Sequence, residues 1–236
     1  MVESMSRIRK GRADGATGWL WPGQSTSEVG LHVVTGGGPH RWPVPGAHRC
    51  VVEAVDIDRD AGLAAVLILT LPSRGAATVY QETYEHDAVR GWISAGGASA
   101  SGGSWARTHA RPSAARSGPS VVMSVGGSSG GQSYLDRMRL TEEGRGLEER
   151  ATVNWVNATV IDVSVEVDHL LLAKRRIKAP PHGRCVVVWK SAAPTGVDRP
   201  LRPRLAAVDR NGRILTELGP HDILDTFTQA FLDELA

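Results

Sequence analysis

Short apolar runs with a two-residue period dominate this chain and restrict it to a fold built from strands. In the stretch VIDVSVEVDH, residues 160–169, apolar and polar residues alternate without a break from Ile161 to Asp168. Successive side chains of a strand point to opposite faces, so the alternation predicts a strand with one buried and one solvent-facing side.

Weaker runs of the same kind recur along the chain, separated by turn-forming sequences such as DAG, GGGP, EEGRG, APPHG and DRNG. Many short strands without amphipathic helices between them favour an antiparallel sandwich or barrel over a parallel α/β fold. The further predicted strands span residues 29–35, 48–58, 77–84, 88–94, 120–125, 150–156, 183–190, 204–209 and 213–218.

Two of the runs allow a more specific prediction. The stretch GLAAVLILTLP, residues 62–72, is apolar on both faces and predicts a central strand, with a buried helix as the alternative. In RLAAVDRNGRILTEL, residues 204–218, Asn211 and Gly212 tolerate positive φ between two apolar runs. This unit is therefore predicted to be a β-hairpin.

The last segment, residues 220–236, has the three-to-four-residue spacing of an amphipathic helix. Pro220 suits the first helical position, and Asp222 favours the positive end of the helix dipole. Such a stripe either packs on the chain's own sheet or docks in a groove of a partner. The partner-binding candidates on the stripe are Ile223, Leu224, Phe227, Phe231 and Leu235.

We therefore expect a mainly β protein, an antiparallel β-sandwich of immunoglobulin-like size with one C-terminal amphipathic helix. The predicted organisation is a loosely ordered N-terminus over 1–28, a sandwich unit over 29–219 and the helix over 220–236. The glycine- and serine-rich run 91–105 is predicted to be either a packed loop or a seam between two lobes, placed within 96–119.

Composition limits the compartment and the class of partner. With 236 residues, 41% of them hydrophobic, the chain can build a sizeable core. The 27 basic and 25 acidic residues nearly cancel, so no overall charge draws it to nucleic acid or to a membrane. Its start has no apolar leader run, and Cys50 and Cys185 suggest buried thiols, so we expect a cytoplasmic protein. The abundance of Ala, Gly and Arg leads us to expect a bacterial source.

One serine lies in a catalytic-looking motif. Gly126 to Gly130 match G-x-S-x-G around Ser128, after an apolar run. The stretch resembles the serine region of the α/β-hydrolase family, which implies a nucleophile elbow at Ser128 with Asp198 or Asp209 and then His221 as triad partners. The strand-helix alternation of that family is missing before Ser128, so a serine hydrolase is an alternative here and not the main prediction.

Two acidic segments are candidates for metal sites. Asp56, Asp58 and Asp60 alternate before Gly62 as calcium ligands do, but the spacing departs from a calcium loop, and a strand with a solvent-facing acidic side that leads into a turn is preferred. The stretch QETYEHDAV, residues 81–89, is predicted to be a solvated turn instead of a metal site. No cofactor is expected.

Basic residues gather in four segments that would form an anion or nucleic-acid surface if they met in space. The small net charge speaks against this, and nucleic-acid binding is kept as a second alternative. The segments are Arg7–Arg12, the set Arg107, Arg111 and Arg116, Lys174–Lys178 and Arg199–Arg204.

The main prediction is a non-enzymatic protein that acts in protein–protein binding or assembly, with another protein or another copy of itself. The candidate surfaces are the C-terminal helix and the loops that bear tryptophan, although packing beneath the loops is the preferred explanation for these tryptophans. The loop-flanking tryptophans are Trp19, Trp21, Trp42, Trp92 and Trp105, whereas Trp155 and Trp189 are predicted to lie in the core.

Overall fold

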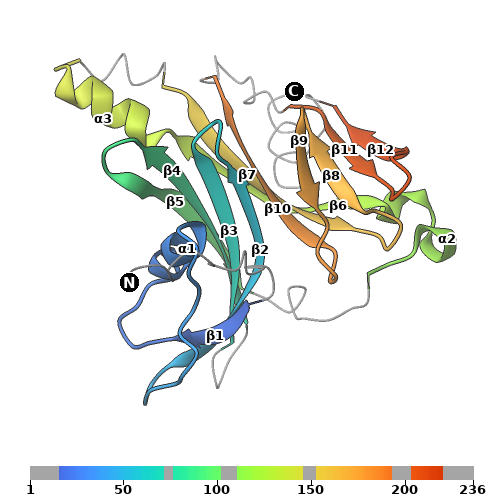
Figure 1. The fold of residues 1–236 in the computed structure, drawn as a ribbon, viewed down its shortest axis with the longest axis horizontal. Helices are drawn as coiled ribbons and strands as arrows, with labels where there is room; N and C mark the ends of the chain where they lie inside the picture. The colour runs from blue at the N-terminus through green and yellow to red at the C-terminus, as the bar shows by residue number, and fades with distance from the viewer. Residues whose placement is uncertain (1–15, 72–76, 102–110, 146–152, 193–202, 220–236) are drawn as a thin grey trace, which may run out of the picture.

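The structure of the chain is a computed structural model that describes residues 16–71, 77–101, 111–145, 153–192 and 203–219 (Figure 1). These residues form three antiparallel sheets, of five, three and four strands, which confirms the prediction of a mainly β, antiparallel fold. We call them sheets A, B and C in chain order. None of the helices in the described residues is long and apolar enough to cross a membrane.

Sheet A is a meander in which each strand pairs with the next along the chain. Its third strand is buried from Leu63 to Thr70, as predicted for a central strand that is apolar on both faces. The strands are β1 (Ala16–Leu20), β2 (His48–Asp58), β3 (Leu63–Leu71), β4 (Thr78–Asp87) and β5 (Gly91–Ser101).

Helix α1 (Thr26–Val34) covers the outer face of sheet A. The prediction of a strand over 29–35 is therefore wrong. The start of the helix is fixed by a capping box, in which Ser25 accepts the N–H of Glu28 and Glu28 accepts the N–H of Ser25. The sequence STSE carries this signal, and the apolar Val29 and Val33, one helical turn apart, pack against the sheet.

The contact between α1 and sheet A requires a glycine at position 30. A Cβ atom there would lie 2.1 Å from the Tyr84 hydroxyl oxygen. That hydroxyl donates a hydrogen bond of 2.8 Å to the Ser27 carbonyl, so the buried Tyr84 ties β4 to the helix backbone. Gly30 thus sets how closely the helix approaches the sheet.

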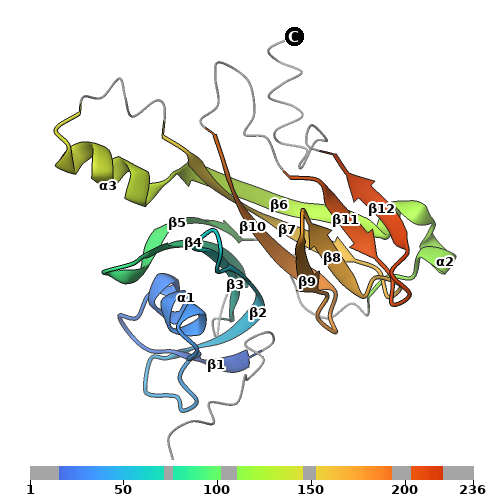
Figure 2. The same ribbon diagram turned by 45° about the horizontal axis from the view of Figure 1, so that its top comes forward.

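Sheet B lies between the other two sheets (Figure 2). Alternate residues of its central strand enter different cores: Val156, Ala158 and Val160 pack with sheet A, and Ile161 and Val163 pack with sheet C. The three strands, in the order β10-β7-β6, are β6 (Met123–Gln132), β7 (Trp155–Val163) and β10 (Arg184–Ser191).

The strand predicted from the alternation of residues 160–168 ends at Val163. Residues 164–168 turn away instead, and Val165 is half exposed. Arg111 donates hydrogen bonds to the carbonyls of Val163, Ser164 and Val167, which replace the strand ladder in this turn. An arginine far away in the sequence thus donates to the carbonyls that a neighbouring strand would have bonded, had the predicted strand continued.

Sheet C closes the third layer, with its strands in the order β12-β11-β8-β9. The predicted hairpin is confirmed: β11 and β12 pair antiparallel around a turn in which Gly212 has a φ of 81°. The strands are β8 (His169–Leu172), β9 (Arg175–Lys178), β11 (Leu205–Val208) and β12 (Ile214–Leu218).

Short helices lie in the connections between strands: two precede β6, and one links β6 to β7. They are α2 (Ala114–Ser117), the 3-10 turn Pro119–Val121 and α3 (Tyr134–Glu142), and α3 projects beyond the end of β6 (Figure 1). The glycine-rich run 91–105, predicted to be a loop, is strand β5 as far as Ser101. The predicted seam within 96–119 lies partly outside the described residues, as does the whole predicted helix 220–236.

The predicted N-terminal segment 1–28 is described from residue 16 onward. There it forms β1, a turn and the start of α1. Both cysteines, Cys50 and Cys185, are buried, as the sequence indicated.

We expect Gly30→Ala to lower the free energy of unfolding by about 1–3 kcal/mol, because the new methyl group displaces the Tyr84 hydroxyl. Urea unfolding followed by circular dichroism measures the change. In a Tyr84→Phe background, which lacks the clashing oxygen, the cost of Gly30→Ala should be smaller. Gly131→Ala is the matched control, since a Cβ atom there meets nothing within 4 Å; an equal cost at both positions would contradict the close approach of α1.

Candidate functional site

The structure places the serine of the G-x-S-x-G motif inside a strand. Ser128 lies in β6, which continues to Gln132, so the sharp turn that a nucleophile elbow needs directly after the serine does not form. The Ser128 hydroxyl lies 2.6 Å from the Thr159 hydroxyl of the neighbouring β7. Asp209 accepts the backbone N–H groups of its own hairpin turn, and His221 lies outside the described residues.

Two of the three aspartates that alternate like calcium ligands hold a guanidinium. Asp56 and Asp58 form ion pairs of 3.0 and 3.3 Å with Arg175 of β9, whereas Asp60 is exposed in the following turn. The prediction of a solvent-facing Asp56 is wrong, because β10 packs across β2 and leaves this residue only 5% exposed. Among the described residues, no group of three or more His, Cys, Asp or Glu side chains is placed to hold a metal ion.

Asp56 and Arg175 together bond the outward-facing backbone groups of Val188 at the edge of β10. Val188 donates its N–H to Asp56 over 2.8 Å, and its carbonyl accepts a hydrogen bond from Arg175. An uncovered edge would be a template for pairing with another chain, so this pair acts against aggregation at β10. Burial is the main cause that raises the pKa of Asp56 to about 6, although Arg175 and the Val188 N–H oppose it.

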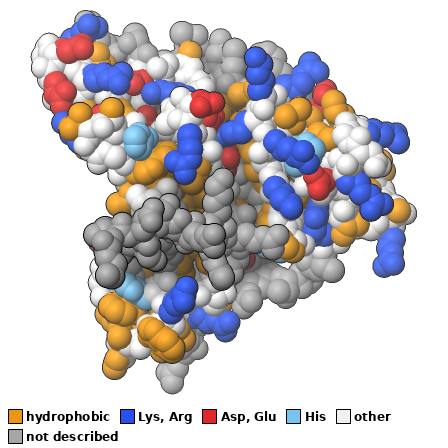
Figure 3. Space-filling model, in the orientation of Figure 1, with side chains coloured by type: hydrophobic (Ala, Val, Ile, Leu, Met, Phe, Trp, Pro, Cys, Tyr) orange, Lys and Arg blue, Asp and Glu red, His pale blue; other side chains and the backbone are white. Residues whose placement is uncertain are grey.

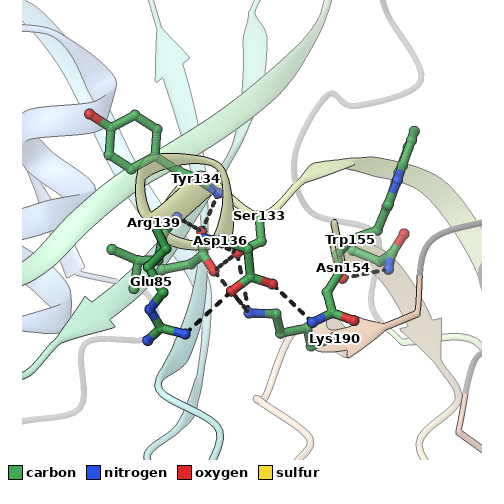
Figure 4. A network of polar contacts seen from close by, with 10 residues as sticks. Glu85, Ser133, Tyr134, Asp136, Arg139, Asn154, Trp155 and Lys190 are labelled. Carbon is green, nitrogen blue, oxygen red and sulfur yellow. Dashed lines mark hydrogen bonds and ion pairs between the residues drawn. The ribbon is translucent and has the colours of Figure 1, made fainter. Parts of the chain in front are cut away.

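A second buried carboxylate, Glu85 of β4, anchors helix α3 (Figure 4). It accepts hydrogen bonds from the Ser133 hydroxyl and the Tyr134 N–H, both at 2.6 Å, and from the Leu135 N–H at 3.2 Å. Backbone N–H groups in the first turn of a helix have no partner within the helix, and the helix dipole also favours a negative charge there. The stretch that contains Glu85 was predicted to be a solvated turn, and it is instead a strand with Glu85 on its inner side.

Lys190 of β10 completes this network. Its ammonium lies 3.5 Å from Glu85, 3.1 Å from Asp136 and 3.2 Å from the Ser133 hydroxyl oxygen. Asp136 also accepts a hydrogen bond of 2.9 Å from Asn154, and these partners lower its pKa against the effect of burial. We call Glu85, Ser133, Asp136, Asn154 and Lys190 the α3 clasp, because they join sheet A, sheet B and α3.

The α3 clasp contains a serine, a lysine and a helix N-terminus, which are parts that some hydrolases use. Their arrangement here serves structure. Ser133 is fully buried, and its hydroxyl donates a hydrogen bond to Glu85. The Glu85 carboxylate also accepts the backbone N–H groups that a developing oxyanion would need. A substrate carbonyl has no position from which to meet both the hydroxyl and these donors.

Glu82, on the opposite face of β4, plays the same part for α1. Its carboxylate accepts a hydrogen bond of 2.6 Å from the hydroxyl of Thr26, the first residue of that helix. Burial raises the pKa of Glu82 above its ordinary value, while the Thr26 bond opposes the rise. The two glutamates of β4 therefore fix the starts of the helices on either side of sheet A.

One arginine from each of three basic segments is held by groups of the chain itself. Arg111 is bound to carbonyls, Arg175 to Asp56 and Asp58, and Arg204 to Glu217 at 2.9 Å. Arg116 is exposed on α2. The segment Arg7–Arg12, Arg107 and residues 199–202 lie outside the described residues.

Exposed apolar side chains instead gather where the chain enters and leaves α1. We call Trp21, Pro22, Trp42, Pro43, Val44 and Pro45 the Trp–Pro platform, since all six are exposed. Trp42 is 78% exposed, the largest departure from the expectation that the loop tryptophans pack beneath their loops. Figure 3 shows hydrophobic side chains exposed at the lower left, where Figure 1 places β1 and the loop that leads into β2.

The backbone and rings beneath the Trp–Pro platform are held in place. The Trp21 ring stacks on the His40 ring, with centroids 3.7 Å apart and planes 12° apart. The Trp21 indole N–H donates a hydrogen bond of 2.9 Å to the Trp42 carbonyl, and the Trp19 N–H donates one of 2.7 Å to the His40 carbonyl. The exposed surface is thus presented by a fixed scaffold.

Two proline–glycine turns lie side by side in the Trp–Pro platform. The Gln24 N–H closes the first turn onto Trp21, and the Ala47 N–H closes the second onto Val44. Gly23 and Gly46 both have a φ of 82°, as the third residue of a type II turn requires. A Cβ atom at Gly46 would lie 3.2 Å from Pro22 of the other turn.

A groove of about 440 Å³ runs between the Trp–Pro platform and the exposed side of α1. Aromatic and apolar side chains form part of its wall, and Gln24, Glu28 and two imidazoles supply polar groups. Its lining includes Trp21, Pro22, Glu28, Leu31, His32 and His40.

No protein-family model, curated protein or solved structure matches the chain. The geometry of the described residues is therefore the basis on which a function can be assigned.

We expect Glu85→Gln to lower the free energy of unfolding by about 3 kcal/mol, because one carboxylate satisfies three donors and Lys190 inside the protein. Urea unfolding measures the loss, and amide exchange should show faster opening of α3. Glu142→Gln, on the same helix but in an exposed pair with Arg90, should cost less than about 1 kcal/mol. Equal effects of the two changes would show that the α3 clasp does not anchor the helix.

The burial of Asp56 also predicts a pH dependence. Its folded pKa of about 6 exceeds the ordinary value of 3.8, so the folded state holds the proton more tightly than the unfolded chain does. The contribution of Asp56 to stability therefore falls as the pH rises from about 4 to about 6. Urea unfolding across this range should show that the free energy of unfolding of wild type, minus that of Asp56→Asn, declines as the pH rises and levels off above pH about 7. A difference that grows with pH would contradict the assignment.

Proposed function

We propose that the chain is a non-enzymatic protein-binding protein and that the Trp–Pro platform is its contact surface. The observation that carries the proposal is the run Trp42 to Pro45, four consecutive apolar residues that are all exposed. A folded chain gains nothing for its own stability from such a run, and in a soluble protein it marks a functional surface.

The rigidity of the Trp–Pro platform supports this function. Binding costs free energy when loops and side chains must be ordered, and a surface that is already fixed avoids most of that cost. Here the two turns are closed by backbone hydrogen bonds, and Trp21 is held by stacking and by its indole N–H. Trp42 then projects from a fixed base, as an interface anchor does.

The composition of the Trp–Pro platform also supports a protein partner. Tryptophan is enriched among the residues that carry most of the binding energy at protein interfaces, and proline adds apolar area with little conformational entropy to lose. The neighbouring groove offers room for a partner side chain beside Trp21. The proposed architecture around this surface is a layered β-sandwich that acts as a scaffold.

The polar clusters of the interior leave this surface as the best supported candidate. The α3 clasp and the Asp56–Arg175 pair both satisfy buried backbone groups within the chain. Their members are therefore engaged in structure, whereas the side chains of the Trp–Pro platform point outward.

Selection of peptides from a random display library against the folded full-length chain tests the proposal and needs no partner of defined sequence. We expect selected peptides whose affinity drops at least about tenfold for Trp42→Ala, since an anchor tryptophan contributes about 2 kcal/mol or more. Binding is measured by fluorescence polarisation with purified protein.

Val89→Ser is the matched control, because Val89 is 93% exposed but lies in the turn between β4 and β5, away from the Trp–Pro platform. It should leave the affinities unchanged. Peptides that bind Trp42→Ala as tightly as wild type would refute the assignment of the surface.

A further inference from the structure

The Trp–Pro platform is bordered by basic residues. Arg41 directly precedes Trp42, and His48 and Arg49 follow the second turn at the start of β2; all three are exposed. A partner that covers the apolar centre would bring its own edge against two guanidinium groups. Charge complementarity therefore favours a partner that is apolar in the middle and acidic at its rim.

The chain itself carries a segment with this composition. Residues 220–236 follow β12 and contain four acidic residues, Asp222, Asp225, Asp233 and Glu234, and no Lys or Arg. Their apolar residues recur at helical spacing, and both phenylalanines of the protein, Phe227 and Phe231, lie on that stripe. The sequence predicts an amphipathic helix here, and such helices bind by laying their apolar stripe into an apolar groove.

We propose that residues 220–236 of one copy bind the Trp–Pro platform of another copy, a proposal that rests on the function proposed above. Phe227 and Phe231 cover Trp42 and the groove beside Trp21, and the acidic residues face Arg41 and Arg49. The segment is the occupant because it joins the required apolar stripe to the required charge.

The positions of the two surfaces decide how copies would join. The described chain leaves sheet C after β12, whereas the Trp–Pro platform lies next to β1 of sheet A, on the opposite side of sheet B (Figures 1 and 2). A contact between them is heterologous, with different surfaces on the two copies. It therefore leaves one free surface at each end and lets further copies add as the concentration rises.

Complementation between two full-length variants tests this arrangement. Trp42→Ala removes the anchor of the platform but keeps the C-terminal segment, and the double change Phe227→Asp and Phe231→Asp does the reverse. Sedimentation velocity should show that wild type associates with rising concentration and that each variant alone is at least about tenfold weaker in self-association. An equimolar mixture of the two variants should form a complex of two copies, because one intact surface of each kind remains.

Two further variants sharpen the result. Arg41→Glu should weaken association and make it less sensitive to salt, and Val89→Ser should leave it unchanged. Circular dichroism melting of every variant establishes that each is folded.

Several outcomes would overturn the proposal. A wild type that stays monomeric at all concentrations excludes it. A mixture that forms no complex, while Trp42→Ala alone fails to associate, also excludes it, because that result indicates contact between two platforms. A lower melting temperature for the phenylalanine variant, without a change in association, shows that the segment packs on its own sheet. In any of these cases, library peptides that require Trp42 would leave the proposed function standing.

Discussion

The burial of strands β7 and β10 of sheet B on both faces is the constraint on which the rest of the structure depends. Strands β7 and β10 are apolar on both sides, and neither face can be left in water without a large loss of hydrophobic stabilisation. Sheet A covers one face, through Leu67 and its neighbours, and sheet C covers the other, through Leu170 and Leu205.

Two closely packed interfaces leave backbone groups at strand edges and helix starts that water cannot reach. Carboxylates supply the missing acceptors, Asp56 for the Val188 N–H at the edge of β10 and Glu85 for the N–H groups at the start of α3. Glu82 accepts a side-chain donor instead, the hydroxyl of the first residue of α1. Each lies where an unmet donor would cost about 1–3 kcal/mol. The acidic residues that resemble a catalytic or metal-binding set in the sequence are therefore mostly parts of the framework, and the surface left for a partner is the Trp–Pro platform.

The sequence predicted the elements whose signals are local. The run 48–58 became β2, the both-sided apolar run became the central β3, and Asn211–Gly212 formed its hairpin. The prediction failed where a distant partner decides the conformation. Arg111 ends β7 at Val163, although the alternation continues to residue 168, and β4 pairs with the glycine-rich β5 along a run that was predicted to be a loop. Helix α1 was missed although its capping box is visible in STSE.

The candidate site was predictable in part. The sequence marked the loop tryptophans as a partner surface or as packing and favoured packing, whereas Trp42 is exposed. Local sequence could not reveal this, because Trp42 lies beside two turns, at Pro22 and Gly46, that approach each other only in the folded chain. The burial of Glu85 and Asp56 was not predictable, since both depend on sheets that meet only in the folded chain.

The Trp–Pro platform is exposed in its side chains and fixed in its backbone, and the proposed function depends on both properties. Hydrogen exchange of the full-length chain, resolved at single amides, tests them most directly. We predict slow exchange for the N–H groups of Trp19, Gln24 and Ala47, which close the platform, together with ready quenching of tryptophan fluorescence by acrylamide. Exchange of these amides at the rate of an unstructured peptide would contradict the proposal, because a mobile loop could not present Trp42 as a fixed anchor.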